Sequence, residues 1–206
     1  MIVIIDYGVG NLRSVQKAFE QLGHEAIVSE DPKALLMADG VVLPGVGAFG
    51  DAMQALKQRQ LAEPIINFAN TDKPLLGICL GMQLLFSTSE EYGEHAGLNL
   101  LPGRVLKFSL DYKVPHVGWN QLLIERSHPL VEHVSDKAHA YFVHSYYVAP
   151  AAPSLIVAKT EYGISFPSMV AKGNVMGVQF HPEKSSQTGL KMLDNFAHMC
   201  EKRGVI

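Results

Sequence analysis

The first half of the chain alternates between short apolar runs and longer segments whose apolar residues recur at helical spacing. Ile2–Ile5 is an apolar run rich in β-branched residues, as expected of a strand buried on both faces. Further strands are predicted at Glu25–Val28, Val41–Leu43 and Leu75–Ile78, and helices at about Leu12–Leu22, from Asp31-Pro32, at about Phe49–Phe68 and at about Leu80–Ser87. Such alternation predicts a parallel sheet with helices on both faces.

The second half reads differently, as short strands separated by turns. They are predicted at Arg104–Phe108, Gln121–Ile124, Tyr141–Val148, Leu155–Thr160, Ser168–Ala171 and Val175–Phe180. A helix returns only at the end, where Leu190, Leu193, Phe196 and Cys200 share one face. We expect an α/β fold, a mostly parallel open sheet flanked by helices with antiparallel strands added in the second half, and one domain over residues 1–206.

Composition narrows the function classes. The 206 residues carry a net charge of −3 without a basic cluster, which disfavours nucleic acid and membrane partners. Two cysteines, Cys79 and Cys200, imply no disulfide framework, and Cys200 fits a buried structural thiol. The first residues show no basic signal region, so a cytoplasmic protein is expected.

Residues 77–81 read Gly-Ile-Cys-Leu-Gly, with Cys79 where a buried strand gives way to a helix. Glycine-x-nucleophile-x-glycine in this context is typical of a nucleophile elbow, in which the helix N-terminus favours a thiolate. The alternative is an ordinary buried cysteine in a core strand.

His181 and Glu183 are the candidate base and its orienting group. They follow the last predicted strand, two residues apart, so both can face the carboxyl edge of the sheet, where Cys79 also lies. A surface His-x-Glu without a role is the alternative, whereas a zinc deaminase is excluded because no Pro-Cys-x-x-Cys follows.

An oxyanion hole would complete such a site. Its first donor would be the backbone N–H of Leu80, and the second could come from the glycine-rich turn Pro44–Gly50. That turn also contains G-x-G-x-x-G, but the acid that a dinucleotide site needs at the end of the next strand is replaced by Cys79.

Several stretches together resemble the class I, triad-type glutamine amidotransferases, and among them the glutaminase subunits of imidazole glycerol phosphate synthase. They are PGVGAFG, GICLGMQ, PHVGWN, YFVHSYY and HPEKSS, and the resemblance covers the whole chain. It implies a flavodoxin-like fold, with Cys79 as nucleophile, His181 as base and acid, and Glu183 as orienting group. The other implied residues are Val46, Gly47 and Leu80 for the oxyanion hole and Gln83, Ser145, Tyr146 and Glu91 for glutamine binding.

The resemblance also implies a partner, a (β/α)₈-barrel cyclase that takes up ammonia through an internal channel. Trp119, Asn120, Tyr141 and Lys184 match positions at that interface or at the ammonia gate. No cofactor and no metal are expected, and His128, His133, His139 and His144 form no evident ligand set.

Other readings stay open at this point. They are another class I glutaminase subunit, a cysteine peptidase or chaperone on the same fold, and a non-catalytic flavodoxin-like module. Gln83 with the His181 and Glu183 pair disfavours the last.

Overall fold

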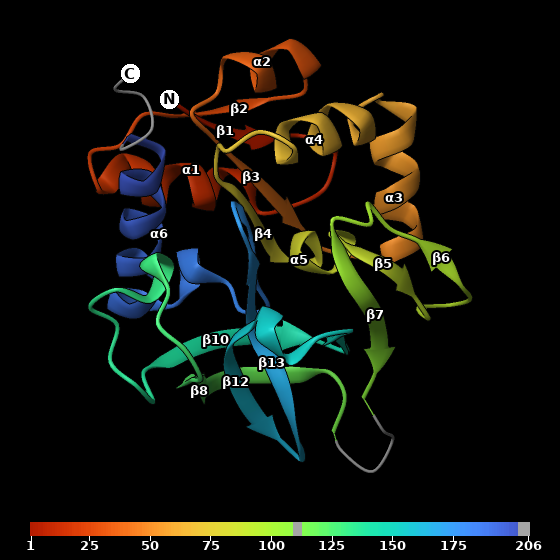
Figure 1. The fold of residues 1–206 in the computed structure, drawn as a ribbon, viewed down its shortest axis with the longest axis vertical. Coiled ribbons are helices and arrows are strands. Elements are labelled where there is room, and N and C mark those ends of the chain that lie inside the picture. The colour runs from red at the N-terminus through yellow and green to blue at the C-terminus, as the bar shows by residue number, and fades with distance from the viewer. Residues whose placement is uncertain (109–112, 202–206) are drawn as a thin grey trace.

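The computed structural model describes residues 1–108 and 113–201. Its main sheet has eight strands in the order β2-β1-β3-β4-β14-β13-β12-β9, with the neighbours from β2 to β14 parallel and the rest antiparallel (Figure 1). Their bounds are β2 Ala26–Ser29, β1 Ile2–Ile5, β3 Gly40–Gly45, β4 Leu75–Cys79, β14 Val175–Val178, β13 Ile164–Lys172, β12 Ile156–Tyr162 and β9 Leu123–Ile124. The predicted fold class is confirmed.

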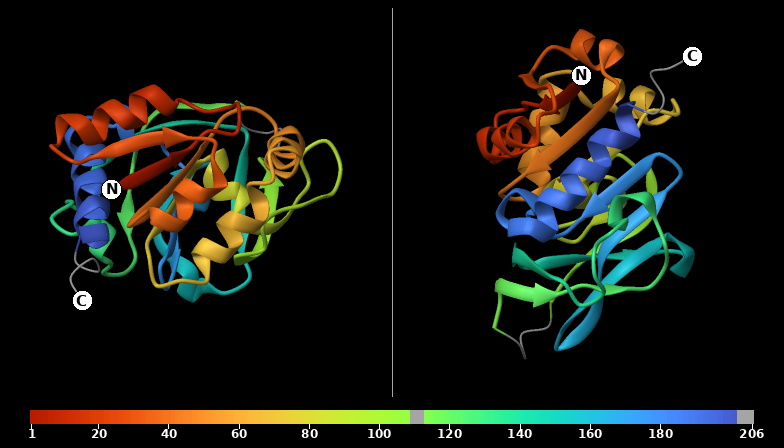
Figure 2. Two further views of the ribbon diagram at one scale, coloured as in Figure 1. Left: turned by 90° about the horizontal axis from the view of Figure 1, so that it is seen from above. Right: turned by 90° about the vertical axis from the view of Figure 1, so that its left-hand side faces the viewer.

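Helices cover both faces of the parallel part. One face carries α1 (Leu12–Gln21) and α6 (Ser186–Glu201), which lie side by side (Figure 2). The other carries α2 (Pro32–Met37), α3 (Phe49–Gln58), α4 (Ala62–Ala69) and the short α5 (Leu80–Leu84). Within the described ranges no helix is long and apolar enough to cross a membrane.

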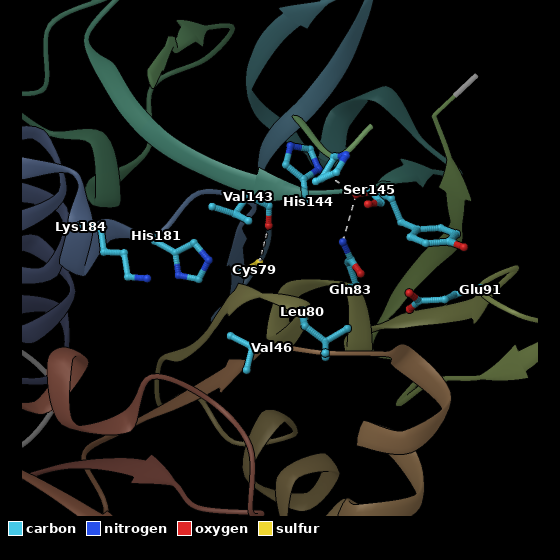
Figure 3. A pocket seen from close by; sticks show the side chains of 13 residues that line it. Val46, Cys79, Leu80, Gln83, Glu91, Val143, His144, Ser145, His181 and Lys184 are labelled. Atoms are coloured by element: carbon cyan, nitrogen blue, oxygen red, sulfur yellow. Dashed lines mark hydrogen bonds between the residues drawn. The ribbon is translucent and has the colours of Figure 1, made fainter. Parts of the chain in front are cut away.

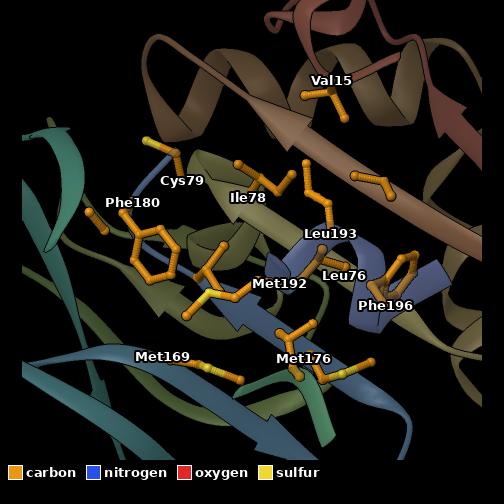
Figure 4. Close-up of a cluster of buried hydrophobic side chains, with 14 of the residues drawn as sticks. Val15, Leu76, Ile78, Cys79, Met169, Met176, Phe180, Met192, Leu193 and Phe196 are labelled. Carbon is orange, nitrogen blue, oxygen red and sulfur yellow. The ribbon is translucent and has the colours of Figure 1, made fainter. Parts of the chain in front are cut away.

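The two faces of β1 supply two cores, because successive side chains of a strand point to opposite sides. Ile2 and Ile4 belong to the cluster that holds Phe19 and Phe196 of the α1–α6 layer. Val3 and Ile5 belong to the cluster under α2–α5. Figure 4 shows the first cluster, in which Leu193 and Phe196 of α6 approach Leu76 and Ile78 of β4. The continuously apolar strands are thus explained by burial on both sides.

Two smaller sheets lie beside the main one. Four strands pair in the order β11-β7-β5-β6, and β10 pairs with β8. Their bounds are β5 Phe86–Ser89, β6 His95–Ala96, β7 Leu101–Lys107, β8 His116–Gln121, β10 His139–His144 and β11 Tyr146–Pro150. The backbone N–H of His181 donates to the Tyr141 carbonyl at 2.9 Å, which fixes β10 beside the segment that follows β14.

The structure corrects several predicted elements. The helix predicted at Phe49–Phe68 is two helices, because Gln60 adopts a positive φ of 57° and Pro64 needs a place in the first turn of α4. The helix predicted to reach Ser87 ends at Leu84 and is followed by β5, whose sequence Phe-Ser-Thr-Ser is short and mostly polar and carries no clear strand pattern.

Strand predictions in the second half also need correction. The strand predicted at Tyr141–Val148 is broken at Ser145 into β10 and β11, which belong to different sheets. Strands β6 and most of β8 were not predicted. Of the later strands only β14 joins the sheet in parallel.

Candidate active site

The backbone at Cys79 makes the sharp turn from β4 into α5. Its φ of 55° and ψ of −113° are strained for a residue with a side chain. A Cβ on Gly81 would lie 1.8 Å from the Leu43 carbonyl oxygen, and one on Gly77 would lie 2.7 Å from the Gly81 oxygen. Both flanking glycines are therefore needed for close backbone approach, as the elbow interpretation requires.

His181 and Glu183 lie in the turn that follows β14. The ring Nδ1 of His181 lies 2.9 Å from Glu183 Oε1, and both side chains are almost fully buried. The contact forms across a 3₁₀ turn, Pro182–Lys184, rather than along an extended strand as the sequence suggested. Since Nδ1 is engaged by the carboxylate, Nε2 is the ring nitrogen left for the sulfur.

The charge balance of this group favours a protonated ring. Burial works to lower the pKa of His181, but its hydrogen bonds to Cys79 and Glu183 and the negative charges of both outweigh burial and raise that pKa to about 10. An imidazolium held beside a thiol is the arrangement that favours a thiolate nucleophile.

Two further groups contact the sulfur. Gln179 Nε2 lies 3.8 Å from Cys79 Sγ, and Sγ lies 3.8 Å from the Val143 carbonyl oxygen. Gln179 is fully buried and its Oε1 accepts a hydrogen bond from Gln83 Nε2 at 3.1 Å. Gln179 was not predicted as a site residue, although it stands two residues before His181.

A cavity of about 370 Å³ opens over Cys79 (Figure 3). His181 and Lys184 lie to one side of the sulfur in this view, and Gln83 and Glu91 to the other. The lining residues are Val46, Gly47, Cys79, Leu80, Gln83, Glu91, Pro115, Val143, His144, Ser145, Tyr146, His181 and Lys184. The structure thus brings together ten of the predicted site residues, while Glu183 lies behind His181.

The far side of the cavity carries polar groups suited to an amino acid. Glu91 Oε2 accepts from the backbone N–H of Phe49 at 2.7 Å, and burial raises the pKa of this carboxyl despite that bond. Gln83 Nε2 also donates to the Tyr146 carbonyl at 3.1 Å. Gln83 therefore fixes the backbone of the segment on which Ser145 and Tyr146 line the cavity.

The glycine-rich turn after β3 borders the cavity through Val46 and Gly47. Gly47 has a φ of 95° with open space around it. Glycine is therefore needed here for its backbone conformation and not to make room for a neighbour. A Cβ on Gly45 would lie 2.6 Å from the Tyr7 hydroxyl, which donates to the Pro44 carbonyl at 2.8 Å. Burial and the charge of Cys79 raise the pKa of Tyr7, so this hydroxyl keeps its proton and anchors the turn.

A pair of buried histidines lies next to the segment Ser145–Tyr146 that lines the cavity. His116 Nδ1 lies 3.0 Å from His144 Nε2, and His144 Nδ1 lies 2.8 Å from the Tyr146 carbonyl. Asn120 Nδ2 lies 3.3 Å from His116 Nε2, which completes a chain of three side chains. Burial lowers the pKa of His116 to about 4 and that of His144 to about 3, so both rings are neutral.

The four residues predicted for the partner interface, Trp119, Asn120, Tyr141 and Lys184, differ in exposure and in the groups they contact. Trp119 is 54% exposed and packs edge-on against Tyr141 with ring centroids 5.9 Å apart. Lys184 lines the cavity, whereas Asn120 is tied to His116 and, at 2.9 Å, to the Glu161 carbonyl. Val117 and Val143 are exposed on the same two strands, β8 and β10.

Comparisons with known proteins show the family of the chain and support its fold. The family model "Glutamine amidotransferase class-I" matches residues 3–200. A solved structure described as a glutamine amidotransferase superposes with a TM-score of 0.77 at 18% identity, covering 98% of this chain and all of that one. PurLQS from Thermotoga maritima gives a TM-score of 0.74 at 20% identity, covering 98% and 97%. The chain belongs to the class I glutamine amidotransferases and is an enzyme of that type.

Relatives with more than half of their residues identical indicate one group within this family. The imidazole glycerol phosphate synthase subunit HisH of Desulfitobacterium hafniense (strain DSM 10664 / DCB-2) is 55% identical over 196 residues, covering 95% of this chain and 93% of the relative. HisH of Methanosarcina acetivorans is 54% identical over 202 residues, covering 97% and 98%. The resemblance read from the sequence is thereby confirmed.

Proposed function

We propose that this chain is the glutaminase subunit of an imidazole glycerol phosphate synthase and acts in histidine biosynthesis. It hydrolyses L-glutamine to glutamate and ammonia and passes the ammonia to a (β/α)₈-barrel cyclase, which converts PRFAR to imidazole glycerol phosphate and AICAR. The observation that carries the proposal is the contact of Glu183 with His181 beside Cys79, on an elbow that opens into one cavity. The similarity to HisH subunits supplies the pathway.

In the first half of the reaction the Cys79 thiolate attacks the side-chain amide carbon of glutamine. The backbone N–H of Leu80 and an N–H of the Val46–Gly47 turn donate hydrogen bonds to the amide oxygen and stabilise the negative charge that develops on it. His181, protonated in the resting site, gives its proton to the departing nitrogen, which leaves as ammonia. A γ-glutamyl thioester remains on Cys79.

In the second half a water molecule attacks the thioester carbonyl carbon. His181, now neutral, takes a proton from that water, and the carbon–sulfur bond breaks to release glutamate. The proton on His181 and the charge on Cys79 are then restored. Glu183 holds the ring through Nδ1 in both halves.

Glutamine binding falls to the side of the cavity away from His181. Glu91 offers a carboxylate for the substrate ammonium, and Gln83, Ser145 and Tyr146 line the space for its amide and backbone. A charge-assisted contact of this kind fixes orientation as well as affinity.

The partner face lies where β8 and β10 expose apolar side chains next to the cavity. Trp119, Val117 and Val143 form an exposed apolar patch, with Tyr141 and Lys184 beside it. Aromatic anchors are typical of protein interfaces. We place the cyclase here, in a cytoplasmic heterodimer, with the chain's residues 1–206 acting as one amidotransferase domain and no cofactor or metal in catalysis.

The test is glutamate release by the isolated chain, and by the chain with a cyclase subunit and a PRFAR analogue. Because Gly47 lets the oxyanion turn adopt more than one conformation, we expect low basal turnover that rises at least ~10²-fold in the complex, the usual effect of one oxyanion donor. Cys79→Ser should abolish glutamine-dependent synthesis but keep synthesis from added ammonium.

Two results would contradict the proposal. One is labelling of Cys200 rather than Cys79 by 6-diazo-5-oxonorleucine, a glutamine-like affinity label. The other is peptide hydrolysis by the isolated chain without glutamine turnover in the complex. A full basal rate would contradict only the coupling argument.

A further inference from the structure

Among the described residues, a cluster of side chains that could ligate a metal lies outside the active-site cavity, between α6 and the turn that follows α1. It consists of His24, Asp194 and His198, whose candidate ligand atoms all lie within 4.8 Å of one another. We propose that this cluster binds a divalent transition-metal ion of the zinc type.

The three α6 residues of this region share one helix face. Asp194, His198 and Glu201 stand at positions i, i+4 and i+7, so their side chains point the same way. That face looks toward His24, because Asp194 Oδ1 lies 2.9 Å from His24 Nε2. Asp194 Oδ1 also lies 3.6 Å from His198 Nδ1. Ligand atoms around a four-coordinate zinc are about 3.3 Å apart, so these two separations suit one ion, and the ligand atoms of His24 and His198 lie within 4.8 Å of each other.

His24 is held rigidly by the end of α1. The backbone N–H of His24 donates to the Phe19 carbonyl at 3.0 Å and that of Gly23 donates to the Glu20 carbonyl at 3.0 Å. With Gly23 at a φ of 84°, this is a Schellman motif, which fixes the backbone of the residue that follows it. A ligand on such an element keeps its position when no ion is bound.

The second ring nitrogen of His24 has its own carboxylate partner. Nδ1 lies 3.3 Å from Glu201 Oε1, on the opposite edge of the ring from Asp194. Metal-ligating histidines commonly donate their other N–H to a carboxylate, which orients the ring and raises its basicity. Glu201 is thus a positioning residue for the ligand His24, and this contact is independent of the three-ligand geometry.

The remaining groups near the cluster leave room for an ion. Lys191 Nζ pairs with the other oxygen of Asp194, Oδ2, at 3.2 Å. His198 Nδ1 also lies 2.9 Å from the Asp194 carbonyl oxygen, and because this side chain is 51% exposed its ring can turn from that oxygen to an ion. Two imidazoles and one carboxylate suit Zn²⁺, Ni²⁺ or Cu²⁺, with water completing the shell.

A bound ion would join segments 170 residues apart, the end of α1 and the last described helix. Ligands that bind only the folded state stabilise it by mass action. The competing explanation is that no metal binds. His24 then forms ion pairs with Asp194 and Glu201.

The experiment uses the full chain carrying Cys79→Ala, so that the active-site thiol cannot bind the probe. After treatment with a chelator, Zn²⁺ is titrated calorimetrically and the thermal midpoint is followed with and without Zn²⁺. We expect one Zn²⁺ per chain and a raised midpoint. Adding His198→Ala should weaken binding at least tenfold, and Asp194→Asn should do the same while keeping the side-chain shape.

His139→Ala is the matched control, since His139 is an exposed histidine outside the cluster, and it should bind Zn²⁺ unchanged. Circular dichroism of each apo variant checks its folding. Absence of stoichiometric Zn²⁺ binding in the Cys79→Ala chain overturns the proposal in favour of the ion-pair cluster. So does a loss of binding in His139→Ala equal to that in His198→Ala.

Discussion

Asn11 and Glu183 are hydrogen-bonded across 172 residues of chain, with Asn11 Nδ2 donating to Glu183 Oε1 at 3.2 Å. The same oxygen faces His181 Nδ1 at 2.9 Å. In the described part of the chain the other carboxylate oxygen, Oε2, is buried without a hydrogen-bond partner. Asn11 is therefore a positioning residue for the carboxylate that orients His181.

Replacing Asn11 tests that relationship. A hydrogen bond to a charged group contributes about 1.5–3 kcal/mol, so Asn11→Ala should lower kcat for glutamine about tenfold or more with little change in KM. Asn11→Asp should be worse, because two carboxylates would then face each other. Steady-state kinetics of the complex give the measurement, and Asn67→Ala, an exposed asparagine on α4, is the control. A pure KM effect would refute the positioning role.

The titration of His181 should depend on Cys79. The pKa of His181 is raised to about 10, above the ordinary 6.5. Its contribution to stability is therefore fully present below about pH 6.5 and is lost as the pH rises through about 10. In Cys79→Ala two of the raising causes are gone, so NMR titration of the ring should give a lower pKa. An unchanged pKa would show that the sulfur does not act on the ring.

The buried histidine pair should make the fold sensitive to acid. The folded-state pKa values of about 4 for His116 and about 3 for His144 lie below the ordinary 6.5. Their contribution is therefore present above pH 6.5 and is lost as the pH falls through those values. Urea unfolding at several pH values should show His116→Gln less acid-sensitive than wild type, with His139→Gln as the control. Equal slopes for all three would argue against this pair.

Gly81 should tolerate no side chain. A Cβ there would lie 1.8 Å from the Leu43 carbonyl oxygen. The nearest atoms all belong to the backbone of Leu43 and Pro44 in β3, which cannot move aside as a flexible side chain could. Gly173 has a φ of 58° but open space around it, so alanine there costs only about 1–2 kcal/mol from the backbone conformation. Chemical unfolding should thus show a much larger loss for Gly81→Ala than for Gly173→Ala. Similar losses would mean that the β3–α5 approach adapts.

The sequence predicted those parts of the molecule whose physical cause is local. The elbow around Cys79 was predictable because its steric demand is written in two neighbouring glycines, both of which the structure shows in close backbone contact. The parallel strands were predictable because burial on both faces makes them continuously apolar.

Other features depend on residues that the fold alone brings together. His116 and His144 are 28 residues apart and carry no spacing signal, so their pairing could not be read from the sequence. Asn11 stands 172 residues from Glu183, so no local pattern could indicate their contact. The break at Ser145 was hidden because the pattern on either side of it is equally apolar. Gln179, which contacts the sulfur, was also missed, although the sequence held a local clue: it stands two residues before His181.

The strained backbone at Cys79 lowers the stability of the fold at the position of the proposed nucleophile. With a φ of 55° and a ψ of −113°, a residue that carries a side chain is disfavoured by about 1–3 kcal/mol, so the usual order of alanine over glycine should be reversed at this position. Cys79→Gly should therefore unfold at higher denaturant concentration than Cys79→Ala, although neither can attack an amide. The cysteine side chain therefore costs stability at the position where the proposed reaction needs its sulfur.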